Sequence, residues 1–203
     1  IDHFRGLSAY YTIDYGSTTA RDGRWVKGPG KALIKALKEH VGSNIIAEDL
    51  GYMDDDVKDL LAYSAYPGMG VLEFAFDSRD SNANDNIPYN LKKKQIAYVG
   101  THDNQTVMGW IKELSPDALD FCKEYIRYRE GDAFNWAMIR ELMATVCDTA
   151  IVQAQDLLGL DENARMNTPS TVGRNWQWMA EESSFTDEIK EKLKEMSHTY
   201  GRA

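Results

Sequence analysis

Short runs of apolar residues alternate with helical patterns along the chain, and each run ends in a cluster of polar residues. Runs of this kind are typical of strands buried on both faces, which occur in parallel sheets covered by helices. The sequence therefore predicts an α/β fold. The predicted strands are residues 44–51, 70–76, 95–100 and 150–156.

Apolar residues recur at helical spacing between these runs. One predicted helix begins after Gly28-Pro29-Gly30 and stops at Gly42, and a second follows Asp54, where carboxylates suit the first turn of a helix. Two further helices are predicted around residues 139–147 and 189–200. The sequence shows no internal repeat and no clear domain boundary, so residues 1–203 are interpreted as a single segment.

The charge balance excludes several classes of partner. The chain has 23 Lys and Arg against 32 Asp and Glu, a formal net charge of −9, which argues against nucleic acid and anionic membranes. No stretch approaches the roughly 18 apolar residues of a membrane span. Cys122 and Cys147 form no CxxC pair, which predicts reduced thiols in a cytoplasmic protein. No metal-ligand spacing occurs, so no metal site is predicted.

A carboxylate follows an apolar run at three places, Asp2, Glu48 and Asp103. The carboxyl ends of parallel strands share one face, and in (β/α)₈ barrels that face carries the active site. Two carboxylates about 5–5.5 Å apart serve a retaining glycosidase as nucleophile and as acid/base. Acidic residues also end strands as turn formers and helix caps. Spacing alone does not decide between these two interpretations.

Six segments carry a more specific signal. They are Ile1–Gly6, Trp25–Gly30, Ile46–Gly51, Gly68–Phe76, Gly100–Thr106, and Arg165–Pro169 leading to Asn175–Trp178. In these segments, which follow one another in family order and cover nearly the whole chain, the sequence resembles the 4-α-glucanotransferase family (amylomaltase, or disproportionating enzyme).

The resemblance implies a (β/α)₈ TIM barrel that transfers α-1,4-glucan segments to the 4-hydroxyl of an acceptor glucan with retention. It implies that Asp2 is the nucleophile, that Glu48 is the acid/base, and that Asp103 stabilises the transition state. This chemistry needs no cofactor. The predicted partners are α-1,4-glucans, with no nucleic acid and no membrane.

Three further side chains are predicted to contact the glucan, namely Trp25, His102 and Asn104. Trp25 lies in a Gly/Pro-rich stretch before a helix, where sugar stacking and core packing are equally supported. Trp176 and Trp178 are interpreted as structural. The polar stretch 77–94 is too long for a simple connector and is predicted to be a functional loop.

The motif order predicts that the chain is roughly the later half of the barrel, from the fourth to the eighth strand, plus a C-terminal helix. The family's arginine two positions before the nucleophile would precede Ile1. The chain alone is expected to be inactive, because barrel closure sets the separation of the nucleophile and the acid. Its open sheet edges predict self-association or pairing with the missing half.

Two alternatives stay open. An α-amylase-type hydrolase shares the three carboxylates and differs in whether water or a sugar attacks the intermediate, although Asp2–Arg5 and Trp25–Gly30 favour the transferase. A non-catalytic half-barrel that only folds or binds glucan is the second alternative.

Overall fold

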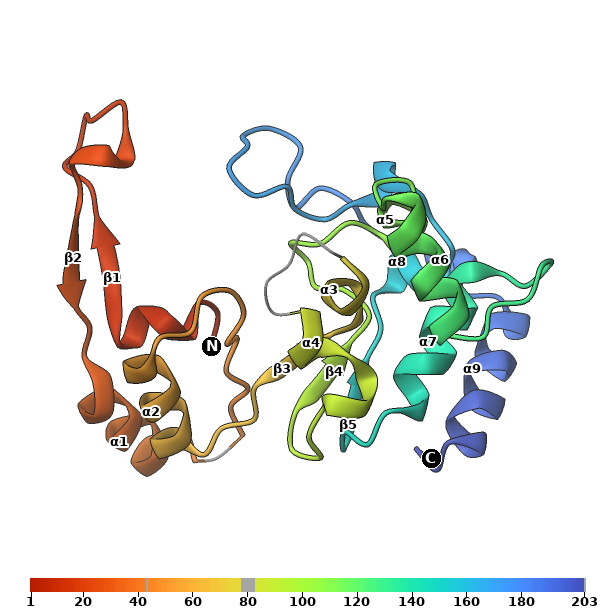
Figure 1. Ribbon diagram of the computed structural model, residues 1–203, viewed down its shortest axis with the longest axis horizontal. Coiled ribbons are helices and arrows are strands. Elements are labelled where there is room, and N and C mark those ends of the chain that lie inside the picture. Colours follow the sequence, from red (N-terminus) through yellow and green to blue (C-terminus); the bar gives the residue numbers. More distant parts are fainter. Residues whose placement is uncertain (43, 78–82, 203) are drawn as a thin grey trace. The chain divides into compact units, whose positions relative to one another are not determined.

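The computed structural model describes residues 1–42, 44–77 and 83–202. The chain forms two compact units, Ile1–Met69 and Gly70–Ala203, which are described separately (Figure 1). No boundary between them was visible in the sequence. That residues 1–203 belong to one barrel stays a prediction and is taken up under the proposed function.

The first unit consists of an exposed hairpin and two helices. Its elements are η1 (Phe4–Leu7), β1 (Ala9–Thr12), η2 (Ala20–Asp22), β2 (Arg24–Lys27), α1 (Gly30–His40) and α2 (Asp55–Ser64). β1 and β2 pair antiparallel, with Tyr11 opposite Trp25, and their rings meet edge to face with centroids 5.4 Å apart. The hairpin was not predicted, because its largely exposed strands lack the alternation of a half-buried strand.

Both predicted helices of this unit are confirmed as α1 and α2. Ile34 of α1 is fully buried with Phe4, Ala47, Val57, Leu60 and Tyr66, and this cluster is the core of the unit. The first helix was predicted to stop at Gly42, but α1 ends at His40 and the next residue, Val41, is 57% exposed.

The structure assigns no regular strand to residues 44–51, where the sequence predicted one. The segment is nevertheless hydrogen-bonded on two sides. The Ala47 nitrogen donates to the Pro67 carbonyl at 2.9 Å, and the Glu48 nitrogen donates to the Ile1 carbonyl at 2.9 Å. The segment therefore makes the backbone bonds of a central strand over too short a length to count as one.

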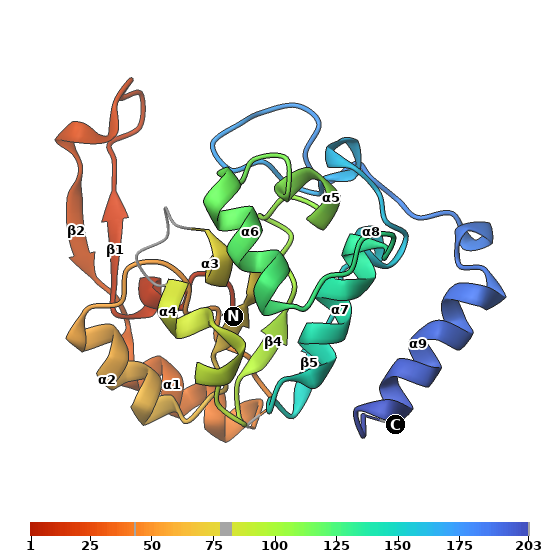
Figure 2. The same cartoon turned by 45° about the vertical axis from the view of Figure 1, so that its right-hand side comes forward.

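The second unit is built on a three-stranded sheet in the order β3 (Met69–Val71), β4 (Ile96–Tyr98) and β5 (Thr149–Ile151). β4 and β5 pair in parallel, with Ala97 beside Ala150, so the predicted parallel arrangement is confirmed for this pair. The helices, which Figure 2 shows around the sheet, are α3 (Leu72–Phe76), α4 (Ala83–Asn86), α5 (Val107–Trp110), α6 (Pro116–Tyr125), α7 (Phe134–Ala144), α8 (Ala154–Leu157) and α9 (Asp187–Thr199).

Two predicted strands were too long. In the run 70–76, only the first two residues continue β3, and Leu72–Phe76 is the helix α3. Leu72, Ala75 and Phe76 are buried at i, i+3 and i+4, a helical spacing that a run of apolar residues broken only by Glu73 conceals. In the run 150–156, the strand ends at Ile151 and α8 begins at Ala154.

The core of the second unit lies between the sheet and the helices α3, α5, α6 and α7. The predicted helix around 139–147 is α7, although it ends at Ala144, and the predicted C-terminal helix is α9, which packs against α7. Cys122 and Cys147 are free and buried, and burial raises the pKa of the Cys122 thiol to about 12.

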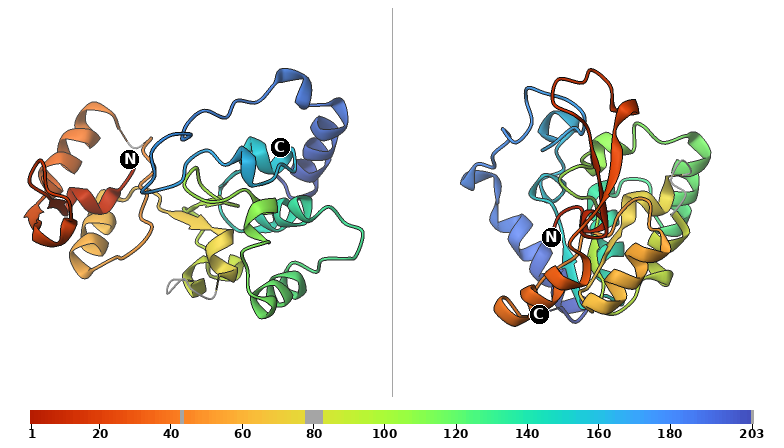
Figure 3. Two further views of the ribbon diagram at one scale, coloured as in Figure 1. Left: turned by 90° about the horizontal axis from the view of Figure 1, so that it is seen from above. Right: turned by 90° about the vertical axis from the view of Figure 1, so that its left-hand side faces the viewer.

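The connections of the second unit carry short helices. In the predicted loop 77–94, α4 and η3 (Pro88–Asn90) occur, while residues 78–82 lie outside the described residues. Figure 3 follows the mostly irregular chain from α8 to α9, which includes η4 (Glu162–Ala164) and η5 (Glu182–Ser184). Within the described residues, none of the helices has the length and apolar character needed to cross a membrane.

The start of α2 depends on Asp54, whose Oδ1 accepts a hydrogen bond from the Val57 nitrogen at 3.0 Å while Oδ2 pairs with Arg5 at 3.0 Å. We predict that Asp54→Ala lowers the free energy of unfolding by about 1–2 kcal/mol, because it removes the helix cap. Asp54→Asn keeps the cap and should cost less than about 1 kcal/mol. Urea unfolding measures both, and equal losses would contradict the capping role.

Candidate active site

In the first unit, the segment that holds Asp2 is joined to the segment that holds Glu48. The Ile1 nitrogen donates to the Ile46 carbonyl, and the Glu48 nitrogen donates back to the Ile1 carbonyl. This exchange around one residue is the bonding pattern of parallel strands, and it places Ile1 beside Ala47. Asp2 and Glu48 each follow that pair directly, so the two carboxylates emerge from neighbouring positions.

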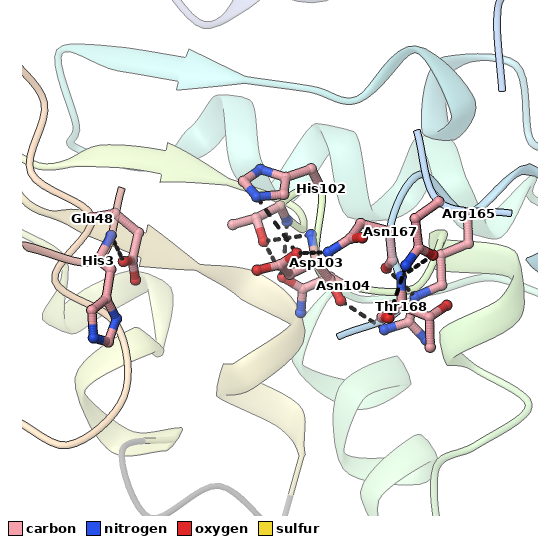
Figure 4. A network of polar contacts seen from close by, with 10 residues as sticks. His3, Glu48, His102, Asp103, Asn104, Arg165, Asn167 and Thr168 are labelled. Carbon is pink, nitrogen blue, oxygen red and sulfur yellow. Dashed lines mark hydrogen bonds and ion pairs between the residues drawn. The ribbon is translucent and has the colours of Figure 1, made fainter. Parts of the chain in front are cut away.

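The Glu48 carboxylate is fixed by two backbone donors. The His3 nitrogen donates to Oε2 at 2.6 Å (Figure 4). The Leu50 nitrogen donates to Oε1 at 2.9 Å, and Glu48 is half-buried. His3 has a positive φ of 50° and precedes η1, so the backbone bends immediately after Asp2. Asp2 itself is exposed. This arrangement leaves one carboxylate free to reach a ligand and holds the other in place.

The next residue, Asp49, has a different environment. Its Oδ1 accepts a hydrogen bond from the Met69 nitrogen at 2.7 Å. A Cβ on Gly68 would meet the Asp49 carboxylate at 2.1 Å, so only glycine permits this approach. Burial, and less strongly the charge of Glu48, raises the pKa of Asp49 above its usual value. Asp49 therefore acts as an anchor for the neighbouring backbone.

Trp25 lies on strand β2, whereas the sequence suggested a loop. The Arg5 guanidinium is 4.7 Å from the centre of its ring and 5.8 Å from that of Tyr52. The Trp25 side chain is 57% exposed and lines a groove of about 680 Å³, together with Lys27, Asp56 and others. Arg5 thus contacts the Trp25 ring, and Trp25 remains accessible to solvent.

In the second unit, Asp103 lies in a turn that follows the carboxyl end of β4. The Asn104 side chain closes this turn, because its Oδ1 accepts hydrogen bonds from the Thr101 nitrogen at 2.9 Å and from the Thr101 hydroxyl at 2.7 Å. The Asp103 nitrogen donates to the Thr101 hydroxyl at 3.3 Å. Asn104, predicted to contact substrate, has its amide oxygen engaged within the protein.

The Asp103 carboxylate is half-exposed and is oriented by donors from a distant segment. Asn167 Nδ2 donates to Oδ1 at 2.5 Å, and Arg165 donates to the Asp103 carbonyl at 2.7 Å (Figure 4). His102 Nε2 is 3.5 Å from the same Oδ1, and the Asn167 nitrogen donates to the His102 carbonyl. Three side chains therefore restrict Asp103 while its second oxygen stays available.

From the sequence, Trp176 was interpreted as structural, and Arg165 and Asn167 were given no role. The Trp176 ring lies 5.0 Å from the His102 ring, and the residue is 61% exposed. Its backbone nitrogen donates to the Met166 carbonyl at 2.8 Å. All three residues belong to segments that carried the family resemblance. The signal available in the sequence was that these polar and aromatic side chains occur in a stretch without a helical or strand pattern.

A buried pair of carboxyl groups lies below the turn. The side chains of Glu73 and Asp156 are each 1% exposed. Asp156 Oδ1 accepts a hydrogen bond from the Val107 nitrogen at the start of α5 (2.8 Å), and burial raises the pKa of Asp156 to about 6. Neither group is accessible to a substrate, so both have a structural role in the protein interior.

The structure therefore brings Asp2 and Glu48 together in one unit, and His102, Asp103 and Asn104 together in the other. Trp25 belongs to the first unit. Among the described residues, no group of three or more His, Cys, Asp or Glu is arranged to hold a metal ion.

Comparison with known proteins gives consistent results. A family model described as 4-alpha-glucanotransferase matches residues 1–184. The 4-alpha-glucanotransferases of Clostridium butyricum and Streptococcus pneumoniae are 41% and 44% identical over the whole of this chain, which covers 42% and 40% of their length. The chain thus spans about two fifths of these relatives. A plastid enzyme of the same name from Oryza sativa is 41% identical.

Two solved structures are similar. The amylomaltase from Streptococcus agalactiae in complex with acarbose has a TM-score of 0.92 and 40% identity, covering 100% of this chain and 41% of that chain. The amylomaltase from Corynebacterium glutamicum has a TM-score of 0.71 and 18% identity over 96% of this chain and 34% of that one, which shows a likeness of fold.

The raised pKa of Asp156 predicts a pH dependence of stability. In the unfolded chain this group titrates near 3.8 and in the folded protein at about 6, so the folded state binds its proton more tightly. Its contribution to stability is complete below the unfolded value and is lost as the pH rises to about 6. The two-unit difference corresponds to about 3 kcal/mol.

We therefore expect Asp156→Asn, which keeps the acceptor for Val107, to remove this component. The free energy of unfolding is measured in urea at about pH 4 and at about pH 7 for both proteins. If the free energy of unfolding of Asp156→Asn falls as steeply with rising pH as that of the wild type, Asp156 is not the cause of the fall.

Proposed function

The chain belongs to the 4-alpha-glucanotransferase family, and on that premise we propose that it carries the catalytic carboxylates of an enzyme that transfers α-1,4-glucan segments between glucan chains. The observation that carries the proposal is the placing of Glu48 by the backbone of Ile1–His3, beside Asp2. A retaining double displacement requires two carboxylates that lie close together, and Asp2 and Glu48 directly follow paired backbone positions.

In the first half-reaction, the Asp2 carboxylate attacks the anomeric carbon and forms a covalent glycosyl ester. The bond to the glycosidic oxygen breaks, and Glu48 gives its proton to that oxygen as it leaves. In the second half-reaction, Glu48 takes the proton of an acceptor 4-hydroxyl, whose oxygen displaces Asp2. Two inversions at the anomeric carbon give overall retention. The structural support is that Asp2 is exposed and that two backbone N–H groups hold Glu48.

Asp103 is proposed to bind hydroxyls of the transferred sugar more tightly in the transition state than in the ground state. Its fixed orientation by Asn167 and its half-exposed position support this role. We propose His102 and Trp25 as sugar contacts, since both rings are accessible and held by neighbours. Asn104 is proposed to contribute through the turn that presents Asp103. No step requires a cofactor.

We further propose that the chain is roughly the second half of a (β/α)₈ barrel, from the fourth to the eighth strand. The parallel pair β4 and β5 supports a barrel sheet, and β3 and β5, at the ends of the strand order, each have an edge for a further strand. The free thiols of Cys122 and Cys147 suit a reducing compartment, which supports a cytoplasmic location.

The test of function uses the full-length enzyme of which this chain is proposed to be a part, with maltotriose as the sole glucan. A transferase yields glucose together with a ladder of longer oligomers, because one glucan is both donor and acceptor. Shortening of maltotriose without longer products would instead establish the α-amylase-type hydrolase.

Glu48→Gln is predicted to lower the transfer rate by about 10²- to 10⁴-fold, because an amide cannot give and take the proton in either half-reaction. Its free energy of unfolding should fall by about 1–3 kcal/mol, because the amide oxygen keeps one backbone hydrogen bond while the amide NH₂ faces the second N–H donor. Asp49→Asn is the matched control and should retain activity, because Asp49 anchors the Met69 backbone. Undiminished transfer by Glu48→Gln would contradict the acid/base role.

Residues 1–203 produced alone are predicted to show no disproportionation of maltotriose and to associate in solution. Without barrel closure the separation of the nucleophile and the acid is not fixed, and a displacement of about 1 Å costs about 10²-fold in rate. Light scattering measures the association, which covers the open edges of the sheet. A stable monomer with full activity would contradict both expectations and the half-barrel proposal.

A further inference from the structure

Glu73, like Asp156, is almost completely buried, and the proposed chemistry does not use it. It lies at the start of α3, is 1% exposed, and neither carboxyl oxygen makes a hydrogen bond among the described residues. Its backbone nitrogen donates to the Val99 carbonyl at 3.0 Å, just beyond the end of β4. The backbone of Glu73 is thereby bonded to the residue that follows β4, the strand that leads into the Asp103 turn.

Burial of an unpaired carboxylate in a protein interior costs far more than burial of the neutral acid. The pKa of Glu73 is raised well above its usual value, first by burial and second by the negative charge of Asp156. The Asn104 side chain and the Arg165 guanidinium oppose this rise less strongly. Burial therefore favours the neutral acid of Glu73 over the carboxylate.

The carboxyl group of Glu73 lies directly against the base of the turn. A Cβ placed on Gly100 would be 3.1 Å from Glu73 Cδ and Oε1, and 3.2 Å from the Cβ of Asn104. Gly100 therefore leaves the space that the carboxyl group occupies. Asn104 is the residue whose Oδ1 closes the turn onto Thr101. Glu73 thus supports the turn from the interior, and Arg165 and Asn167 hold it from outside.

We propose that Glu73 is a positioning residue for Asp103: packed beneath Gly100 and Asn104, it fixes the turn 101–104 and with it the direction of the Asp103 carboxylate. The inference rests on the proposed function of Asp103 and adds a residue that touches no substrate. Because the turn is short and the Asn104 side chain takes part in closing it, loss of its support displaces Asp103, and small displacements are costly to catalysis.

The test measures kcat and KM for transfer in the full-length enzyme. Glu73→Ala removes the support and should lower kcat about 10- to 100-fold with KM for the donor nearly unchanged. Glu73→Gln, an uncharged group of the same shape, should rescue kcat to within about threefold of the wild type at neutral pH. Glu141→Gln is a matched control, because burial also raises the pKa of Glu141, which lies on α7 away from the turn.

The decisive comparison adds Glu73→Ala to Asp103→Asn, because a residue that acts through Asp103 costs little once Asp103 is lost. We expect the double variant to match Asp103→Asn within about threefold. An unchanged kcat in Glu73→Ala, a full additional loss in the double variant, or a Gln variant as impaired as the Ala variant would overturn the proposal. If Asp103→Asn itself keeps wild-type activity, the proposed role of Asp103 fails first, which separates the two failures.

Discussion

The two backbone hydrogen bonds that Ile1 exchanges with Ile46 and Glu48 are the constraint on which the catalytic interpretation of the first unit depends. Parallel pairing fixes which residues stand side by side, and a shift by one residue would send the following side chains to the opposite face. In the observed register Asp2 and Glu48 follow the paired residues together. The His3 nitrogen then donates to Glu48 itself, so the bend after Asp2 also orients the acid.

In the second unit, side chains rather than paired backbone segments orient the carboxylate. Asp103 lies in a turn beyond a strand, where no ladder of backbone bonds holds it, and its orientation depends on side chains. Asn167 and Arg165 hold it from a segment more than sixty positions further along the chain, and Asn104 closes the turn below. The carboxyl groups thus divide by environment: Asp2 and Asp103 are exposed, whereas Glu73 and Asp156 are buried in the protein interior.

The sequence predicted elements whose pattern depends on a single buried face. α1, α2 and α7 show apolar residues at helical spacing, and β4 is a short apolar run that ends in polar residues. Residues 72–76 were predicted as strand, because a helix surrounded by apolar contacts shows no periodicity to distinguish it. The hairpin 9–27 was missed for the opposite reason, since most of it is exposed.

The three carboxylates were visible from their positions after apolar runs, but their roles came from the family resemblance. Asn167 was beyond prediction, because its role depends on a contact 64 positions away.

We propose that Asp2, Glu48 and Asp103 act together on a single sugar ring. A crystal structure of the full-length enzyme with a bound maltooligosaccharide tests this proposal. We expect the Asp2 carboxylate beneath the anomeric carbon, Glu48 about 5–5.5 Å from Asp2 on the bond to be cleaved, and Asp103 bonded to hydroxyls of the same ring. A bound glucan that contacts Asp2 and Glu48 but lies beyond hydrogen-bond reach of Asp103, or the reverse, would contradict the proposal.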